Sequence, residues 1–224
     1  MRLVEPVQNY DQRALFCTKC SILHVRRSDM DVSNPVSSVI PTLDGAVLVV
    51  LAGSTAARSL ADVHQQVPGA SKSGVRLSLL RLVEQGVVLQ APGGYILNRE
   101  HLAAPAVALL AEMRSELLRR IGELVDGWEA GPLLVAAFGS FARRDGDSES
   151  DIDLLLVSKA KSADEQAGEL SGRVRAWTGN ECHVLALAPA DISRMRRNKE
   201  SILGEWDRDL EPIRGDSHVL KGRP

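Results

Sequence analysis

Two aspartates separated by one residue, Asp151 and Asp153, begin an apolar run that reads DIDLLLV. Side chains alternate along a β-strand, so both carboxylates are expected on one face, about 6.6 to 6.8 Å apart along the strand. Two carboxylates at the start of a buried strand repel each other unless a cation lies between them. Mg²⁺ or Mn²⁺ suits such a pair, because the ion takes one or two carboxylates and completes its shell with water and substrate phosphates. The pair therefore predicts a metal site that acts on a phosphate-bearing substrate.

Gly139 and Ser140 follow a second apolar run, LLVAAF, and ten residues separate Ser140 from the first aspartate. A glycine lets the backbone approach a phosphate closely, and the following N–H groups and the serine hydroxyl can bind its oxygens. Arg143 and Arg144 in the same loop either pair with a triphosphate or are solvated cations beside the loop acids. A triphosphate on this turn, with its metal on the paired aspartates, would support phosphoryl or nucleotidyl transfer.

This pattern resembles the signature of DNA-polymerase-β-like nucleotidyltransferases, in which Gly-Ser and D-x-D stand about ten residues apart. The resemblance covers about residues 102–205 and is greatest to the small bacterial minimal nucleotidyltransferase domains. It implies that Asp151 and Asp153 bind Mg²⁺ and that a third carboxylate on the next strand completes the metal site. It also implies that Gly139 and Ser140 hold the phosphates of an NTP such as ATP. Relatives in this family act in toxin–antitoxin pairs and modify a partner protein or tRNA.

The strand expected to carry the third carboxylate reads ECHVLAL, and its one acidic residue is Glu181 at the start. Glu181 is either the third ligand or the base for an attacking hydroxyl, or else a solvated strand end. His183 occupies the next position on the same face. The sequence thus predicts a catalytic set of Asp151, Asp153 and Glu181 that transfers an NMP to a protein or RNA hydroxyl. A domain that senses nucleotide without turnover, in a transcriptional regulator, stays the alternative.

Residues 41–100 show a pattern of three short helices followed by a hairpin, which resembles a winged helix-turn-helix. The expected elements are helices over 46–53, 55–67 and 71–86 and a hairpin over 87–98. The third helix would enter the DNA major groove, and Lys72, Arg76 and Arg81 lie away from its apolar stripe. Modules of this kind also bind proteins, so DNA and a partner protein are both candidate ligands.

The rest of the pattern predicts one long helix over 101–127 and then strands alternating with helices. The apolar stripe of the long helix buries either against the second domain or against a partner chain in a homodimer. The expected fold class is α+β or α/β, with an N-terminal winged helix joined by the long helix to a small mixed-sheet nucleotidyltransferase domain. The expected divisions are a poorly ordered segment over 1–40, the winged helix over 41–100, the connecting helix over 101–130 and the nucleotidyltransferase domain over 131–224.

The composition of the 224-residue chain sets limits on its class. No apolar run is long enough to span a membrane, the first residues lack the apolar stretch of a signal peptide, and three cysteines do not make a disulfide framework. These features favour a cytoplasmic protein with reduced thiols. A net charge of −2 argues against a general nucleic-acid coat but allows a local basic face. Residues 1–29 are expected to be a loosely ordered tail or an artefact of start-site choice.

Overall fold

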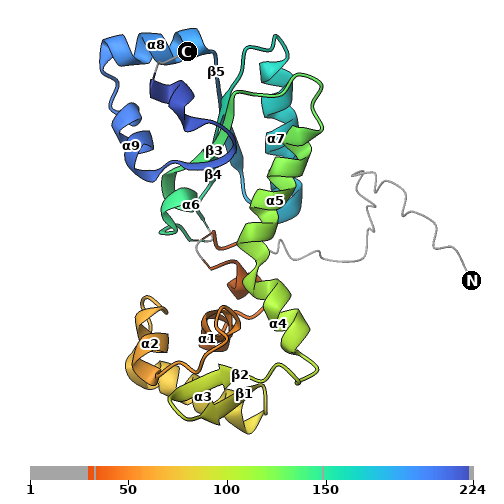
Figure 1. The fold of residues 1–224 in the computed structure, drawn as a ribbon, viewed down its shortest axis with the longest axis vertical. Coiled ribbons are helices and arrows are strands. Elements are labelled where there is room, and N and C mark those ends of the chain that lie inside the picture. Colours follow the sequence, from red (N-terminus) through yellow and green to blue (C-terminus); the bar gives the residue numbers. More distant parts are fainter. Residues whose placement is uncertain (1–29, 33, 148, 222–224) are drawn as a thin grey trace, which may run out of the picture.

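The computed structural model describes residues 30–32, 34–147 and 149–221, which form two parts that lie end to end (Figure 1). One part consists of helices and a two-stranded hairpin, and the other of a four-stranded mixed sheet with helices on both faces. The mixed α and β fold predicted from the sequence is therefore confirmed. The tail expected over 1–29 lies outside the described residues. Within the described residues, no helix combines the length and the apolar character needed to cross a membrane.

The first part contains three helices and an antiparallel hairpin that share one core. These elements are α1 (Leu43–Ala52), α2 (Leu60–Gln65), α3 (Lys72–Glu84), β1 (Val88–Ala91) and β2 (Gly94–Leu97). The second helix begins at Leu60 rather than at Thr55, because Arg58 forms an antiparallel bridge with Tyr95 of β2. Ser59 then caps α2, since its hydroxyl accepts from the Asp62 N–H and its own N–H donates to the Asp62 carboxylate.

The connection between the two parts is a pair of helices, α4 (Ala104–Ala111) and α5 (Met113–Asp126). The prediction of one long helix is wrong, because Glu112 has φ −95° and ψ 4° and interrupts the helical geometry. Buried residues of α4 belong to the core of the first part, whereas buried residues of α5 belong to the core under the sheet. The break therefore lies between the helix that packs in one core and the helix that packs in the other.

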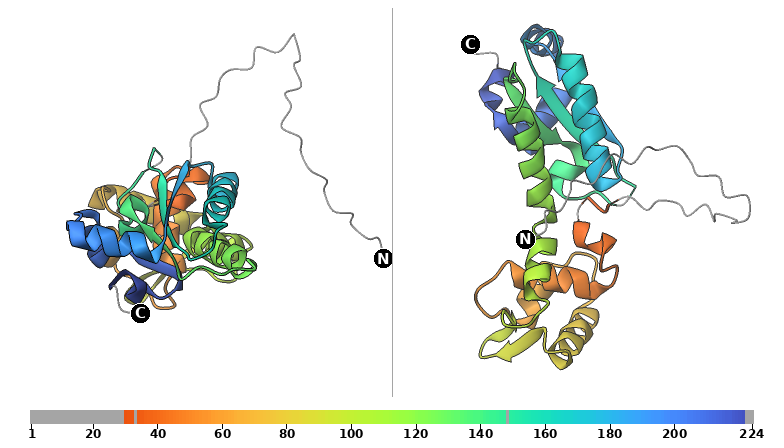
Figure 2. Two further views of the ribbon diagram at one scale, coloured as in Figure 1. Left: turned by 90° about the horizontal axis from the view of Figure 1, so that it is seen from above. Right: turned by 90° about the vertical axis from the view of Figure 1, so that its right-hand side faces the viewer.

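The sheet of the second part has the strand order β5–β4–β3–β6. The strands are β3 (Leu134–Phe138), β4 (Ile152–Val157), β5 (Cys182–Leu187) and β6 (Glu211–Gly215). β3 pairs antiparallel with β4 and β6, while β4 pairs parallel with β5. α5 and α7 (Ala163–Thr178) cover one face, and α8 (Pro189–Asn198) and α9 (Ile202–Asp209) cover the other (Figure 2). The alternating residues of the central strands are thus buried on both faces, apart from Phe138 at the end of β3 and Asp153 in β4.

The segment before α1 is bound to the second part, and we call its residues 30–32 and 34–36 the strap. Met30 and Val32 are buried, and the 3-10 helix η1 (Pro35–Ser38) follows. The Asn180 side chain, 1% exposed, accepts a hydrogen bond from Met30 N at 3.1 Å and donates to Met30 O at 2.9 Å. It also donates to Ser150 O at 3.1 Å. One buried amide therefore ties the strap to the loop that leads into β4.

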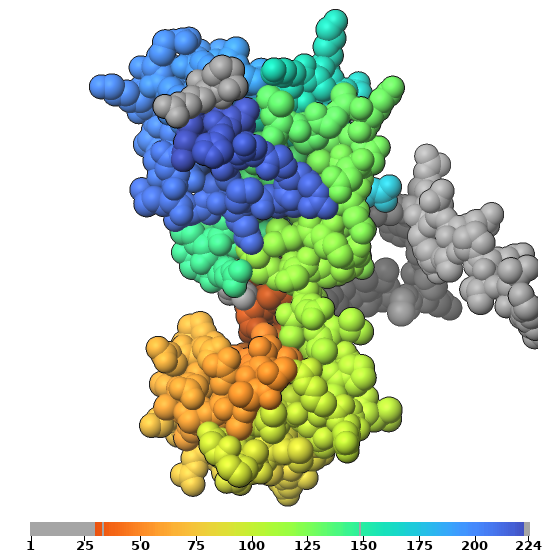
Figure 3. Space-filling view, in the orientation of Figure 1, coloured from red at the N-terminus to blue at the C-terminus, as the bar shows by residue number. Residues whose placement is uncertain are grey.

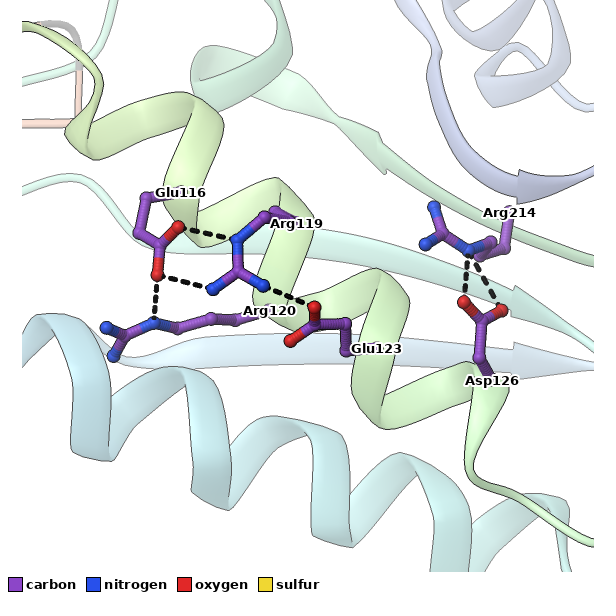
Figure 4. A network of polar contacts seen from close by, with 6 residues as sticks. All are labelled: Glu116, Arg119, Arg120, Glu123, Asp126 and Arg214. Atoms are coloured by element: carbon purple, nitrogen blue, oxygen red, sulfur yellow. Dashed lines mark hydrogen bonds and ion pairs between the residues drawn. The ribbon is translucent and has the colours of Figure 1, made fainter.

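The solvent face of α5 carries a chain of ion pairs (Figure 4). Glu116 accepts from Arg119 at 2.7 Å and from Arg120 at 2.8 Å, and these hydrogen bonds lower its pKa to about 2. Asp126 at the end of the helix binds Arg214 of β6 at 2.9 Å, in front of Gly122, where a Cβ would collide with the guanidinium. Exposed pairs such as these stabilise little each, but the last one joins α5 to the edge strand β6.

Candidate functional site

The turn after β3 and the start of β4 form one structural unit. Phe138 and Asp153 are partners in the antiparallel register, so Gly139 directly adjoins the Asp153 side chain. Gly139 has φ +69°, and a Cβ at this position would lie 2.7 Å from Asp153 Oδ2. Glycine is therefore required for the backbone conformation and also for the close approach. The short helix α6 (Gly139–Arg143), which contains Ser140, begins at this turn.

The two aspartates lie on one side of the strand end, as the alternation predicted. Both approach the same imidazole nitrogen: His183 Nδ1 is 3.6 Å from Asp151 Oδ2 and 3.8 Å from Asp153 Oδ1. Burial raises the pKa of Asp153; among nearby charges His183 lowers it, Asp151 raises it and Arg143 lowers it. The ionised form of Asp153 is thus held in a setting that disfavours its charge, and a cation would relieve that cost.

The neighbouring strand β5 brings a histidine rather than a third carboxylate next to the pair. His183 is the register partner of Asp153 in the parallel pairing. Glu181 precedes the strand, its carbonyl accepts from Ile152 N at 2.9 Å, and its carboxylate forms an ion pair with Arg175 of α7 at 2.8 Å. The catalytic role of Glu181 therefore stays a prediction. The sequence did not predict a role for His183. Its position two residues after Glu181 nevertheless indicated that both side chains lie on the same face of the strand.

The donor set at this site fits a hard divalent ion shared with a substrate. In the described part of the chain, no group of three or more His, Cys, Asp or Glu side chains is arranged to hold a metal ion. Asp151 and Asp153 supply the one or two carboxylates that Mg²⁺ commonly takes from a protein, and water and phosphate oxygens complete its shell. Nearby Cys182 offers no thiolate, because burial, and then the two aspartates, raise its pKa to about 12. We therefore regard the pair as a fit for Mg²⁺.

The two arginines after the turn separate in space. Arg143 Nε binds Asp145 Oδ2 at 2.9 Å, and its charge still lowers the pKa of Asp153. Arg144 ends α6 with φ 61° and lines a cavity that also contacts Val49 of α1. Arg143 is thus the arginine whose charge acts on the aspartate pair, and binding of a nucleotide by either arginine stays a prediction.

The three basic residues expected to contact DNA also differ in their surroundings. Lys72 and Arg76 are exposed on α3. Arg81 instead donates from Nε to Asp44 Oδ2 of α1 at 3.0 Å, and this pairing lowers the pKa of Asp44. Leu77 and Leu80, 63% and 44% exposed, lie on the same helix. The solvent face of α3 is thus part basic and part apolar, which suits a protein ligand as well as DNA.

Residues 115–212 match the family model described as "Nucleotidyltransferase domain". The matched range begins in α5 and ends in β6, so it contains the Gly139 turn, the aspartate pair, Glu181 and His183. No curated protein matches the sequence. The aspartate pair and the Gly-Ser turn thus both lie inside the range that matches this domain model.

Three solved structures of toxin–antitoxin proteins are also similar to part of the chain. A mutant of the toxin–antitoxin MntA–HpeT is 12% identical, with 46% of this chain and 77% of that chain covered and a TM-score of 0.34. The tri-AMPylated Shewanella oneidensis HEPN toxin in complex with MNT antitoxin is 14% identical over 48% and 82% of the two chains, with a TM-score of 0.33. A toxin–antitoxin with AMP-PNP is 14% identical over 49% and 77%, also with a TM-score of 0.33. Similarities this weak carry no argument about the function of this chain.

Proposed function

We propose that the second part of the chain is a Mg²⁺-dependent nucleotidyltransferase that moves an NMP from an NTP to a hydroxyl of a protein or RNA. The observation that carries this proposal is the contact between Gly139 and Asp153, because it joins a phosphate-binding turn and a metal-binding pair in one site. The match to the nucleotidyltransferase domain model supports the reaction class.

Each residue of the site has a role in the proposed reaction. Asp151 and Asp153 hold Mg²⁺, which when bound neutralises charge on the triphosphate. Gly139 and Ser140 present N–H groups and a hydroxyl to the phosphate oxygens, and Arg143 adds a cation. The acceptor oxygen forms a bond to the α-phosphorus as the bond from phosphorus to the bridging oxygen breaks, and pyrophosphate leaves.

Glu181 is the proposed base or third ligand, and its ion pair sets a condition on that role. To take the acceptor proton, the carboxylate must leave Arg175, with which it pairs at 2.8 Å. Both side chains are more than half exposed, so breaking the pair costs about 1 kcal/mol or less. The ion pair is therefore compatible with a catalytic role that begins only when the acceptor is bound.

The test of this function is transfer of label from the α-phosphate. The full chain is incubated with Mg²⁺, each α-labelled NTP and total cell extract, and labelled protein and RNA are separated. We expect Mg²⁺-dependent label on one acceptor, release of pyrophosphate, and no transfer from γ-labelled NTP. Transfer of the γ-label would mean phosphoryl transfer instead. Nucleotide binding without any transfer would favour the alternative of an inactive sensor.

We expect Gly139→Ala to lower the transfer rate about 100-fold or more, because the added Cβ displaces Asp153 Oδ2 and small misplacements at a reacting site have effects of this size. Gly69→Ala is the matched control, since Gly69 has φ +76° and a Cβ there would meet nothing within 4 Å. Both variants should lose about 1–2 kcal/mol of unfolding free energy for the left-handed backbone. Thermal unfolding and the labelling assay measure the two effects. A Gly139→Ala variant with the normal rate would show that the turn and Asp153 do not act together.

For the first part of the chain, we propose that the exposed face of α3 binds a macromolecule, and DNA is the form predicted from the sequence. If the full chain binds DNA from its own promoter, the logarithm of its binding constant should fall linearly with the logarithm of the salt concentration. Arg76→Gln and Lys72→Gln should each make the slope of that line shallower by about one. Arg81→Gln should act mainly on stability, because Arg81 is paired with Asp44. Binding that is independent of salt, or absent, would instead favour a protein ligand on Leu77 and Leu80.

A further inference from the structure

A cavity of about 210 Å³ lies at the junction of the two parts of the chain. Its lining comes from η1, α1, α4, α5 and the residue that ends α6, and includes none of the proposed catalytic residues. Figure 3 shows that the molecule narrows at this level, where the chain near η1 and the α4–α5 connection pass between the two parts. We call this space the junction cavity.

The polar side of the junction cavity has hydrogen-bond donors without partners. The guanidinium of Arg144 has no hydrogen-bond or ion-pair partner among the described residues, and its backbone has φ 61°, which a residue with a side chain rarely adopts. Arg114 Nε is buried without a partner, while its two terminal nitrogens bind Glu211 and Phe141 O. Ser115, which is exposed, belongs to the same lining. A buried donor without an acceptor is costly, so Arg114 Nε indicates a missing acceptor. Arg144 is exposed as well, and it and Ser115 offer further donors to a ligand on this lining.

The charges around this lining leave one cation without a counter-ion. Glu211 pairs with Arg114, and its pKa is lowered first by that hydrogen bond and also by the charge of Arg144. One carboxylate therefore faces two guanidinium groups. Guanidinium groups bind phosphate and carboxylate oxygens through paired N–H donors, so a singly or doubly charged oxyanion would complete the set.

The size and the apolar lining residues of the junction cavity limit which oxyanions could bind there. Its volume is below the roughly 300–1,000 Å³ of pockets for drug-sized ligands, so a whole nucleotide is larger than the space. Val36, Val49 and Leu110 supply apolar side chains to the same lining. We propose that the junction cavity binds one phosphate group, free or on a small organic body, through Arg144, Arg114 and Ser115. This is a second anion site, separate from the triphosphate turn.

The contacts of Arg114 give this site a direct connection to the catalytic turn. Its guanidinium lies 4.5 Å from the centre of the Phe141 ring, and Nη2 donates to Phe141 O at 3.1 Å. Phe141 is fully buried in α6, the short helix that Gly139 begins. An anion that fixes Arg114 therefore also fixes α6. The effect on catalysis rests on the proposed nucleotidyl transfer, whereas the binding itself does not.

Titration calorimetry of the full chain, without nucleotide or Mg²⁺, tests the binding. Inorganic phosphate and glycerol 3-phosphate are the probes, and chloride at equal ionic strength is the blank. Arg144→Gln should weaken phosphate binding at least about tenfold. Arg173→Gln is the matched control, because it removes the same charge from an exposed position of α7 and should leave binding unchanged. Tighter binding of glycerol 3-phosphate than of phosphate would identify an organic phosphate as the ligand, and the reverse would identify free phosphate.

A second variant tests whether the anion needs the volume of the junction cavity, rather than the charge of Arg144. Ala111→Leu adds volume on the lining of the junction cavity and should also abolish phosphate binding. If Arg143→Gln weakens binding and Arg144→Gln does not, the anion binds at the triphosphate turn and the proposal is overturned. Absence of phosphate binding by the unaltered chain overturns it as well. The calorimetry contains no NTP, so its result does not depend on whether the chain transfers a nucleotide. The proposal of phosphate binding and the proposal of nucleotidyl transfer can therefore fail separately.

Discussion

Replacement of both aspartates, Asp151→Asn with Asp153→Asn, is expected to lower α-phosphate transfer by about 10³-fold or more without loss of folded stability. A 10³-fold loss corresponds to about 4 kcal/mol of activation free energy, a reasonable effect for removing the protein ligands of a catalytic metal. The asparagines keep the shape of the side chains but give up the charges that the metal requires.

The stability of this double variant follows from the pKa of Asp153. Burial raises that pKa above its value in the unfolded chain, and the nearby Asp151 raises it too. A carboxyl whose pKa is higher in the folded state opposes folding when it ionises, so the unaltered chain bears this cost at neutral pH. The neutral amides remove the cost. Thermal unfolding at pH 7 without metal should therefore give the variant a midpoint equal to or above that of the unaltered chain.

The control for this experiment removes two carboxylates elsewhere on the second part. Asp164→Asn with Glu165→Gln removes the same two negative charges, but at the start of α7. This helix follows the C-terminal end of β4, whereas the aspartate pair lies at the N-terminal end. This control should keep its transfer activity. Mg²⁺ should raise the unfolding midpoint of the unaltered chain and of the control but not of the aspartate variant, because only a ligand that binds the folded state stabilises it. Undiminished labelling by the aspartate variant would exclude the proposed metal site.

Asn180→Ala is expected to lower the unfolding free energy by about 2–4 kcal/mol, the largest stability effect that we expect from a single polar residue here. The substitution leaves Met30 N, Met30 O and Ser150 O without the amide that now bonds all three. The side chain is 1% exposed, so water replaces these bonds only after local opening. Transfer activity should fall as well, because Ser150 directly precedes Asp151.

Two further variants distinguish the loss of the Asn180 hydrogen bonds from the mere loss of an asparagine. Asn198→Ala removes an exposed asparagine and should change the unfolding free energy by less than about 0.5 kcal/mol. Asn180→Asp can still accept from Met30 N but cannot donate to the two carbonyls, so it should also be destabilised. Thermal and urea unfolding of the full chain measure these differences. Equal stability of Asn180→Ala and the unaltered chain would show that the hydrogen bonds of Asn180 to the strap do not stabilise the fold.

Local patterns in the sequence were enough to predict most of the helices and strands and to select the residues of the candidate site. The run DIDLLLV predicts a buried strand with two carboxylates on one side, because side chains alternate whatever the rest of the fold is. Apolar spacing likewise predicted the three helices, the hairpin and the strands, and Gly139 was recognised as a turn from its place after an apolar run. These features depend on neighbours within a few residues, so they can be predicted from a single sequence.

Other features were decided by residues that are far apart in the chain. The antiparallel register brings Gly139 against Asp153, and the parallel register of β4 and β5 places His183, rather than Glu181, beside the pair. The helical spacing continues through Glu112, but the residues before it pack in one core and those after it in another, and the helix is interrupted between them. Asn180 and Met30, which are 150 positions apart, share no local pattern at all. The sequence thus determined which groups could do the chemistry, whereas strand register and packing decided which of them meet, because such contacts exist only after the chain has folded.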